Sequence, residues 1–355
     1  MLLVRPVAMA DLPDLLALAR LAGVGLTTLP KDEDLLARRI RKSVNSMNNI
    51  PDRPGGESYL FVMQDTANGS IIGASGVVSK VGGFEPFYAY KVETAVAESE
   101  ALKVRKEVRF LKLVTDHNGP AEVGSLFLAA DYRGTDAGRF LQLVRFLFVA
   151  QHPEAFESTV VSELRGVIDG DGESPFWNAL GRHFFEIDFP QADRLSVVNK
   201  RFIAELMPTH PIYLCLLPPE AQRVVGQVHD HSRPALRTLE AEGFAFNDMV
   251  DIFDGGACVS CPRDEIRTVR QCRDQRLACV RAAPDVAADV AFSMVATTGP
   301  SFRACLDKVS PADGGISISA AAADVLRVQL GEPLSVAPLR PTASNPTNPS
   351  GSPTA

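Results

Sequence analysis

The stretch that decides the fold is S-L-F-L-A-A-D-Y-R-G-T-D-A-G-R-F-L, residues 125–141. The apolar residues at its start belong to a predicted strand over residues 123–129. A turn-rich loop over residues 131–138 follows, and a strongly apolar helix is predicted over residues 139–150. This strand–loop–helix unit is a candidate for holding a ligand at the loop.

The loop has the chemistry of a diphosphate-binding site. Gly134 and Gly138 let the backbone turn tightly and approach a ligand, while Arg133 and Arg139 supply positive charge. The unpaired N–H groups and the dipole of the following helix favour an anion at the same place. The absence of a Lys-Ser/Thr pair argues against a nucleotide-hydrolysing P-loop. The alternative is an ordinary strand-to-helix turn, in which the glycines serve geometry alone.

The first 80 residues alternate strand and helix signals. Residues 2–5 predict a strand, and Asp11 predicts the N-cap of a helix. Two apolar runs around the turn at residues 65–69 predict a β-hairpin. This order predicts an α/β or α+β fold with a mixed central sheet flanked by helices. Between the helix that begins near Asp11 and the hairpin, a second helix is predicted from an apolar stripe at helical spacing. The stripe is made by Leu36, Ile40, Val44 and Met47.

Downstream of the loop the same alternation continues. Residues 160–168 and 184–189 predict strands, and Ser174, followed by Pro, predicts the N-cap of a helix between them. Residues 233–242 predict another helix, which Gly243 ends.

Four parts of the chain differ in composition and in predicted secondary structure. We expect a ligand-binding core over residues 1–190 and a second half-lobe over residues 191–256 that completes the active site. Short β-like runs predict a small β-rich unit over residues 257–338. The Pro-, Ser-, Thr- and Asn-rich residues 339–355 predict a disordered tail.

The composition limits the partners. The 355 residues carry a formal net charge of −7, which makes nucleic acid and anionic membranes unlikely partners because binding phosphates requires many Lys and Arg. No run of apolar residues reaches the length of a membrane helix. Six cysteines in a chain of this length do not form a disulfide framework, so we expect a reducing, cytoplasmic location.

Several separated motifs carry a resemblance to a known family. The R-G-x-x-A-G-R-F-L segment resembles the acyl-CoA-binding signature of GNAT N-acyltransferases. Longer motifs in the same order resemble arginine N-succinyltransferases over residues 1 to about 280, and more faintly to 338. These motifs lie at Gly23–Pro30, Glu163–Trp177, Ala204–Tyr213, Gly226–His229 and Asp251–Gly256.

The resemblance implies transfer of succinyl from succinyl-CoA, a co-substrate and not a resident cofactor, to the α-amine of L-arginine. His229 in G-Q-V-H matches the family's proton-donating histidine, and Leu126 matches its succinyl-CoA-binding position. The chain departs from the family pattern at Tyr132, where Trp is common, and after His229, where Asp-His replaces a frequent Pro. His231 is the second choice for the catalytic imidazole.

The substrates need charged partners. The guanidinium of arginine requires a carboxylate, and Glu205, Asp251 and Asp254 are the candidates because they lie in or beside the matching motifs. The alternative for each is an ordinary cap or surface carboxylate. The succinyl carboxylate requires a cation, for which Arg165 and Arg182 are equal candidates.

Other interpretations remain open at this stage. One is the same fold acylating another cationic amine such as ornithine, alone or in a homo- or hetero-oligomer. Another is a non-catalytic protein that binds CoA or an amino acid. Cys258-x-x-Cys261 resembles half a zinc site but lacks a second half, so no metal is expected. The aromatic residues around Trp177 predict core packing, with cofactor stacking as the lesser alternative.

Overall fold

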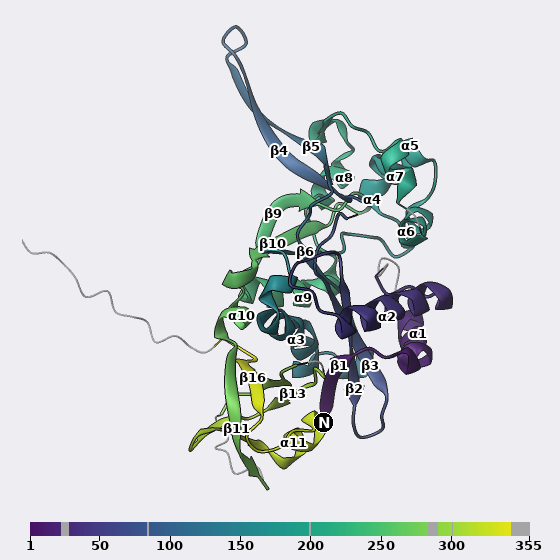
Figure 1. The fold of residues 1–355 in the computed structure, drawn as a ribbon. Helices are drawn as coiled ribbons and strands as arrows, with labels where there is room; N and C mark the ends of the chain where they lie inside the picture. The colour runs from purple at the N-terminus through teal and green to yellow at the C-terminus, as the bar shows by residue number, and fades with distance from the viewer. Residues whose placement is uncertain (23–27, 84, 199, 283–289, 300, 342–355) are drawn as a thin grey trace, which may run out of the picture.

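The computed structural model describes residues 1–22, 28–83, 85–198, 200–282, 290–299 and 301–341. One mixed sheet of 16 strands runs through these residues, in the order β14-β15-β11-β16-β12-β13-β1-β2-β3-β6-β7-β10-β9-β4-β5-β8. Helices cover both faces of its central part (Figure 1). The predicted mixed α/β fold is therefore confirmed.

The elements have the following bounds. The strands are β1 Leu2–Pro6, β2 Ser58–Asp65, β3 Ile71–Val78, β4 Phe87–Ser99, β5 Val104–Asp116, β6 Ala121–Leu128, β7 Thr159–Glu163, β8 Ile212–Tyr213, β9 Ala245–Val250, β10 Ala257–Pro262, β11 Arg273–Arg281, β12 Ser293–Thr297, β13 Ala304–Asp307, β14 Ser310–Ala312, β15 Gly315–Ser319 and β16 Pro333–Pro338. The α-helices are α1 Leu12–Leu21, α2 Glu33–Asn48, α3 Asp136–Gln151, α4 Pro175–Ala179, α5 Gly181–Phe185, α6 Phe189–Val198, α7 Arg201–Leu206, α8 Pro219–Val224, α9 Arg233–Ala241, α10 Arg267–Gln271 and α11 Ala320–Leu326.

The central strand β2 shows why the sheet is covered on both sides. Leu60 and Val62 pack under α1 and α2, whereas Phe61 and Met63 pack under α3. All four are fully buried. Successive strand residues point to opposite faces, so an unbroken apolar run such as this one requires a helical layer on each face.

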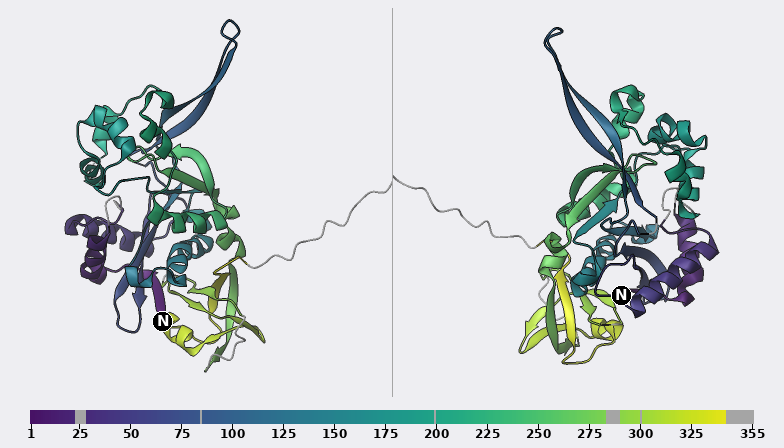
Figure 2. Two further views of the ribbon diagram at one scale, coloured as in Figure 1. Left: turned by 180° about the vertical axis from the view of Figure 1, so that it is seen from behind. Right: turned by 45° about the horizontal axis from the view of Figure 1, so that its top comes forward.

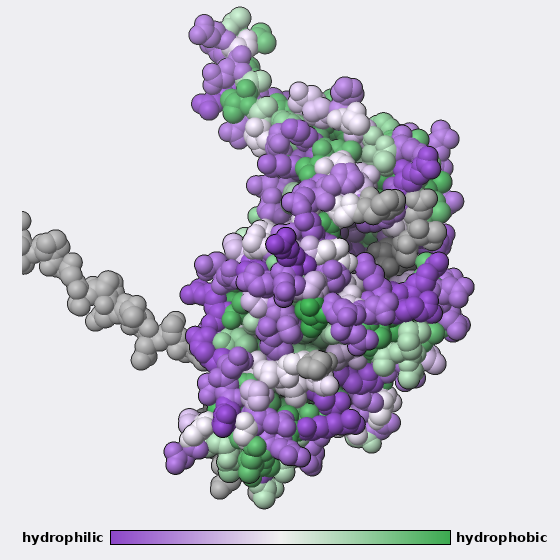
Figure 3. Space-filling model, in the orientation of Figure 1, coloured by the Kyte–Doolittle hydropathy of each residue, from purple (hydrophilic) through white to green (hydrophobic). Residues whose placement is uncertain are grey.

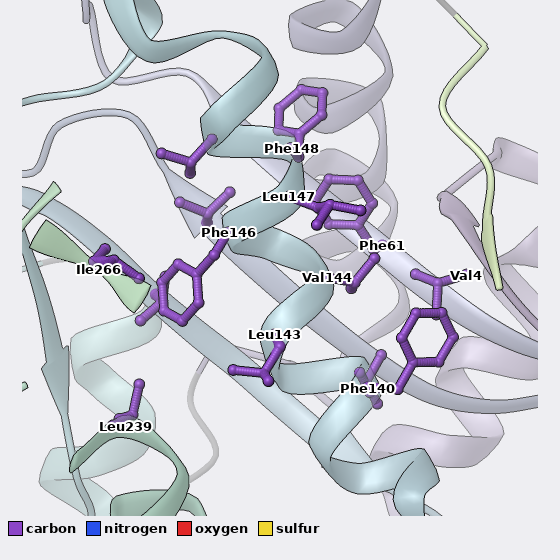
Figure 4. Close-up of a cluster of buried hydrophobic side chains, with 14 of the residues drawn as sticks. Val4, Phe61, Phe140, Leu143, Val144, Phe146, Leu147, Phe148, Leu239 and Ile266 are labelled. Carbon is purple, nitrogen blue, oxygen red and sulfur yellow. The ribbon is translucent and has the colours of Figure 1, made fainter. Parts of the chain in front are cut away.

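Helix α3 forms the centre of the larger core. It begins at Asp136, where the Thr135 side chain accepts the N–H of Ala137 as an N-cap. The helix therefore begins three residues earlier than the apolar pattern predicted. Phe140, Val144 and Leu147 are among the α3 side chains that fill the space over the sheet, and Val4, Phe61, Leu239 and Ile266 come from the surrounding elements (Figure 4).

Most of the predicted elements are present. Strand β1, the β2–β3 hairpin and helices α2 and α9 lie where they were predicted, and the Ser174 side chain caps α4. Asp11 is the N-cap residue of α1, as predicted, but its side chain accepts the N–H of Ala8 and pairs with Arg5 and does not cap the helix. Gly23 and Gly25, and with them part of the Gly23–Pro30 motif, lie outside the described residues.

One strand prediction is wrong, and another extends too far. Residues 184–189 do not form a strand: α5 ends at Phe185, and Glu186 follows in the left-handed conformation with a φ of 55°. The strand predicted over residues 160–168 ends at Glu163 because the chain leaves the sheet there. Both segments are rich in apolar residues that are buried beside the sheet and not within it.

Two smaller hydrophobic clusters lie apart from α3. One cluster is formed by the helices from α4 through α8 together with β4, β5 and β9, around Trp177 and Tyr90. The other joins α11 with β11, β12, β15 and β16 in the C-terminal part. Leu339 is buried and its N–H donates to Phe292, so the predicted tail is ordered at its first residue. Residues 342–355 lie outside the described residues.

Strands β4 and β5 form a long hairpin that extends away from the body (Figures 1 and 2). The two strands pair along 13 residues each, from Phe87↔Asp116 to Ser99↔Val104. Near the body, β4 also pairs with β9 at Tyr90 and Lys91, and β5 pairs with β8. No other strand pairing is found along the outer half of the hairpin among the described residues.

Candidate active site

Strands β6 and β7 are parallel neighbours that separate along their length. They pair only at Ala121↔Val160 and Glu122↔Val161, although both strands continue beyond these pairs. Their carboxyl halves therefore diverge, and this opening is called the fork below. Ligands of open α/β sheets bind outside the carboxyl ends of strands. The fork is therefore the candidate active site.

A β-bulge in β6 lies where the fork opens. Ser125 and Leu126 together face the single β3 residue Ser75, and Ser125 has a left-handed φ of 54°. A bulge turns backbone groups out of the regular ladder. Thr28, from the motif at Gly23–Pro30, accepts the N–H of Ser125 on its hydroxyl at 3.1 Å. Leu126, the predicted binding position for the acyl-CoA, thus lies at an irregular point of β6, while its side chain packs against the core.

Arg145 supports the bulge from α3. Its guanidinium Nη1 donates to the carbonyls of Gly76 and Gly124 at 3.2 and 3.1 Å, and its Nε donates to that of Gln142. The side chain is buried, which lowers the pKa of the guanidinium to about 9. Three acceptors offset part of the cost of burying this charge. Sequence analysis did not single out Arg145, although one charge within an apolar helix was a usable signal.

The loop between β6 and α3 lies at the surface. Gly134 has a φ of 78°, and a Cβ there would meet no atom within 4 Å. Asp136 occupies the first turn of α3, where an anionic ligand would be repelled by its charge. Arg340 pairs with this carboxylate at 2.6 Å and so offsets its charge. The amides of the first turn thus keep their preference for an anion.

The two loop arginines have different surroundings. Arg133 turns back over its own strand, with Nε donating to the carbonyl of Leu128 at 2.9 Å. Arg139 has a buried Nη1 without a hydrogen-bond partner among the described residues. Burial, followed by the charge of Arg340, lowers the pKa of Arg139. Gly138 lies in the first turn of α3, where a Cβ would make only ordinary contacts.

His229 lies beside the end of β7. Its N–H donates to the carbonyl of Arg165 at 2.9 Å, and Gln142 of α3 donates to Ala235 of the helix that follows. The ring Nδ1 accepts the N–H of His231 at 3.1 Å. The neutral ring therefore carries its proton on Nε2. Burial, followed by Arg165 and His231, lowers the pKa of His229, which favours the neutral form.

Segments far apart in the sequence meet next to His229. The Asp254 carboxylate accepts the N–H of Gly166 at 2.7 Å, and Gly226 donates to the carbonyl of Gly255 at 2.8 Å. A Cβ on Gly166 would lie 2.5 Å from the Asp254 carbonyl oxygen, so the two segments approach too closely for a side chain. Three of the motifs quoted above therefore form one packed unit at the end of β7.

Two carboxylates face the fork from its two strands. Burial and the charge of Glu122 raise the pKa of Glu163 well above its ordinary value, while Lys200 acts in the opposite direction. Burial also raises the pKa of Glu122, which Lys200 and Arg39 lower. Neither carboxylate has a hydrogen bond or ion pair with another described residue. The fork therefore brings two acidic groups with raised pKa values together near one lysine.

The three carboxylates predicted from the sequence lie elsewhere or are already engaged. Glu205 is exposed and pairs with Arg201 at 2.9 Å. The Asp251 carboxylate accepts the N–H groups of Phe253 and Asp254 and so shapes the turn after β9. Both oxygens of Asp254 also accept backbone N–H groups. Glu122 was not singled out by sequence analysis, and Glu163 lay in a quoted motif without an assigned role.

The two candidate cations for succinyl differ in position. Arg165 follows β7 beside His229, and its buried Nε has no partner among the described residues. Burial lowers the pKa of Arg165, and Asp254 raises it. Arg182 is exposed and contacts Asn178 at 3.5 Å. Of the two, Arg165 therefore lies at the fork.

The remaining sequence signals have structural explanations. Trp177 is buried, stacks on Phe185 and Phe253, and donates its indole N–H to the Ile187 carbonyl, as core packing predicts. Cys258 and Cys261 lie three residues apart on β10. Cys258 pairs with Glu163 at the fork, whereas Cys261 pairs with Val160 and packs against the α3 core. Because the two thiols face opposite sides of the sheet, they cannot bind one metal together.

A fork between parallel strands, a bulge beside it and a helix N-terminus at its mouth define the class of GNAT-like N-acyltransferases. The chain matches the family model described as arginine N-succinyltransferase beta subunit over residues 2–268. The chain belongs to this family. In the part of the chain that the structure describes, no helix is long and apolar enough to cross a membrane.

Individual relatives agree with this assignment. An arginine N-succinyltransferase of Yersinia pestis (strain Pestoides F) is 46% identical over 271 residues, covering 76% of this chain and 77% of the relative. One of Photorhabdus laumondii is 39% identical over 344 residues, covering 96% and 99%. The solved structure of arginine/ornithine succinyltransferase subunit AI from Pseudomonas aeruginosa has a TM-score of 0.86 at 33% identity, covering 96% of this chain and 99% of that one.

Proposed function

We propose that this protein transfers the succinyl group of succinyl-CoA to the α-amine of L-arginine. The observation that carries the proposal is the fork: β6 leads to the loop before α3, and β7 leads to Arg165, whose carbonyl accepts the N–H of His229. The proposal assigns the coenzyme diphosphate to the first-turn amides of α3, among them that of Gly138, and to Arg133 and Gly134 in the preceding loop. The division into an acyl-CoA-binding core (1–190) and a half-lobe (191–256) that supplies His229 belongs to the same proposal.

The reaction needs no resident cofactor. The amine nitrogen of arginine attacks the thioester carbon, the C–S bond breaks, and the proton lost by the amine balances the one gained by the CoA thiolate. A backbone N–H at the bulge around Leu126 stabilises the oxyanion. The Nε2–H of His229 donates a hydrogen bond to the charge that develops on the thioester. The lone pair of its Nδ1 is already engaged by His231, so His229 serves as the donor.

The carboxylates of Glu122 and Glu163 recognise the guanidinium. They are half-buried, lack partners among the described residues and lie near the ammonium of Lys200. A guanidinium can pair with two carboxylate groups at once. Asp251 and Asp254 position the neighbouring backbone, because their oxygens already accept backbone N–H groups. In this assignment Glu122 and Glu163 take the guanidinium-binding role that the sequence analysis gave to Glu205.

Arg165 binds the carboxylate at the far end of the succinyl group. Its unpartnered Nε and its position next to His229 support this choice over Arg182. An acyl-CoA with a neutral acyl chain would leave this guanidinium without a partner in the closed site. We therefore expect succinyl-CoA to be preferred over acetyl-CoA.

The experiment that tests the function is mass analysis of the products formed from succinyl-CoA and arginine. A new species with the mass of succinylarginine, with release of one thiol per product, is the expected result. Ornithine is assayed in parallel, since the solved relative is named for both amino acids. Tight CoA binding without thiol release with either amine would instead support a non-catalytic binding protein.

The location is proposed to be cytoplasmic. All six cysteines are free thiols, and Cys215 and Cys279 are exposed. Exposed thiols persist in a reducing compartment.

A further inference from the structure

The α-carboxylate of arginine still lacks a partner at the fork. Glu122 and Glu163 are assigned to the guanidinium, and the amine attacks the thioester at the bulge in β6. The carboxylate and the amine are bonded to the same carbon atom, so the group that binds the carboxylate must lie next to the point of attack. A cation with free N–H groups beside the bulge would meet this need.

Arg39 of α2 lies at the bulge. Its Nη2 donates a hydrogen bond to the Ser125 hydroxyl at 2.9 Å, and Ser125 directly precedes Leu126. The Ser125 hydroxyl donates in turn to the Thr28 carbonyl at 3.2 Å. The guanidinium is therefore held beside the stretch of backbone to which the oxyanion is assigned.

The Arg39 guanidinium keeps unused donors. Its Nε and Nη1 have no hydrogen-bond partner among the described residues, and Nε is closed off from solvent. The side chain as a whole is half-buried, so part of it stays accessible. Burial lowers the pKa of Arg39, and the nearby charge of Glu122 raises it. A buried donor without an acceptor is unfavourable, and a carboxylate is the acceptor with which a guanidinium pairs most strongly.

Arg39 and the acids of the fork give the site a positive and a negative end. A Cβ on Gly124 would lie 3.9 Å from the Glu122 carboxylate and 4.0 Å from the Thr28 hydroxyl. The same threonine hydroxyl accepts the N–H of Ser125, so the Glu122 carboxylate lies on the side of β6 that Arg39 contacts. Arginine has the same polarity, with a carboxylate at one end and a guanidinium at the other. Binding both ends would therefore orient its amine toward the bulge.

Other cations of the described residues fit this role less well. Arg145 comes from α3, on the opposite face of the sheet from α2 (Figure 1), where it is buried and donates to three carbonyls. The outer side of α2 is hydrophilic (Figure 3). Arg38 and Arg41 of this helix are exposed and form no hydrogen bond to β6. Lys200 acts on both acids of the fork and so lies at the negative end.

We propose that Arg39 binds the α-carboxylate of the acceptor amino acid, an assignment that rests on the proposed function. Arg39 then selects α-amino acids over amines that carry only a cationic side chain. It also holds the amine where it attacks the thioester. Its contribution is lost from any acceptor without an α-carboxylate.

L-Argininamide tests the assignment, because it has the amine and the guanidinium of arginine but an uncharged carboxamide in place of the carboxylate. The kcat/KM for each acceptor is measured with succinyl-CoA at one pH, from the mass of the product. Arg39→Gln should lower kcat/KM for arginine by about 10- to 100-fold, while the value for argininamide should stay close to that of the wild type. Arg39→Lys keeps the charge and should lose less activity with arginine than Arg39→Gln.

Arg38→Gln is the matched control, since it removes one positive charge from the neighbouring, exposed position, and it should change neither value. Circular dichroism checks that every variant is folded. An equal loss for both acceptors in Arg39→Gln, or no loss for arginine, would overturn the assignment and leave the proposed function in place. A wild type that does not succinylate arginine would overturn the proposed function, and the assignment with it.

Discussion

At the scale of single residues, the proposed site at the fork combines a hydrogen-bond donor, a cation and two carboxylates. His229 and Arg165 are fixed to each other through the backbone, whereas Glu122 and Glu163 keep their oxygens free of other described residues. We therefore distinguish residues that position their neighbours from residues whose side chains are available to bind substrate. Asp254 belongs to the first kind, because its oxygens hold Gly166 and Gly256.

Replacing Glu163 with Gln should weaken arginine binding. Loss of a charge-assisted pair with the guanidinium predicts a rise in KM for arginine of about 10- to 100-fold, with little change in the KM for succinyl-CoA. Steady-state kinetics measure both values. Glu205→Gln is the control and should leave both unchanged, because that carboxylate is exposed and pairs with Arg201. A larger effect at Glu205 would favour the prediction made from the sequence.

The affinity for arginine should also depend on pH. The pKa of Glu163 is raised by burial and by Glu122, so the group is protonated to a higher pH than an ordinary Glu and binds the guanidinium only once ionised. We therefore expect the KM for arginine to fall as the pH rises through a range above the ordinary pKa of Glu, which is about 4.3. The dependence should flatten in Glu163→Gln. An unchanged pH profile in that variant would remove Glu163 from the binding site.

At the scale of elements, the bulge in β6 depends on α3. Arg145 donates to carbonyls of both β3 and β6, and methionine would leave these two acceptors buried and unpaired. Arg145→Met should lower the free energy of unfolding by about 2–4 kcal/mol, measured by denaturant titration. Arg20→Met on the exposed side of α1 is the control. Equal stability of the two variants would show that the bulge does not need Arg145.

How far the sequence predicted these elements depends on where each side chain is buried. Helix α2 could be predicted from its apolar periodicity, and the β2–β3 hairpin from its turn, because local sequence patterns determine both elements. The strand prediction for residues 184–189 failed because an aromatic run is compatible with a strand as well as with a buried helix end. The left-handed φ of 55° at Glu186 also cannot be predicted from composition. The β4–β5 hairpin was not predicted at all, although residues 91–113 alternate in polarity.

The same limit applies to the site. His229, Leu126 and the loop glycines could be proposed from the sequence because they lie in short motifs that resemble a family. Arg145 and Glu122 were missed because their roles arise from non-local contacts, across the sheet and across the fork. The choice between Arg165 and Arg182 likewise needed the structure, since only burial distinguishes them.

At the scale of the whole molecule, the C-terminal part reaches back to the coenzyme loop. Arg340 lies after the last strand and pairs with Asp136 at the start of α3. The loop contains an acid where an anion is expected to bind, and this distant arginine compensates for it. The C-terminal part is thereby joined to the loop to which we assign the coenzyme.

Removing that arginine should weaken CoA binding. Arg340→Ala leaves the charge of Asp136 uncompensated at the helix N-terminus, which predicts a rise in Kd for CoA of about 2- to 5-fold. Combining it with Asp136→Asn should return Kd to near the wild-type value. Isothermal titration measures all three. If the double variant binds as weakly as Arg340→Ala, the arginine acts by some means other than compensating for Asp136.

The central claim is that an acyl-CoA held in the fork presents its thioester to His229. Single-turnover thiol release from succinyl-CoA with saturating arginine, compared between wild type and His229→Ala, tests it most directly. The rate should fall by about 10²- to 10⁴-fold while the Kd for CoA stays unchanged, and His231→Ala should retain most of the rate. A folded His229→Ala protein that releases thiol at the wild-type rate would contradict the account.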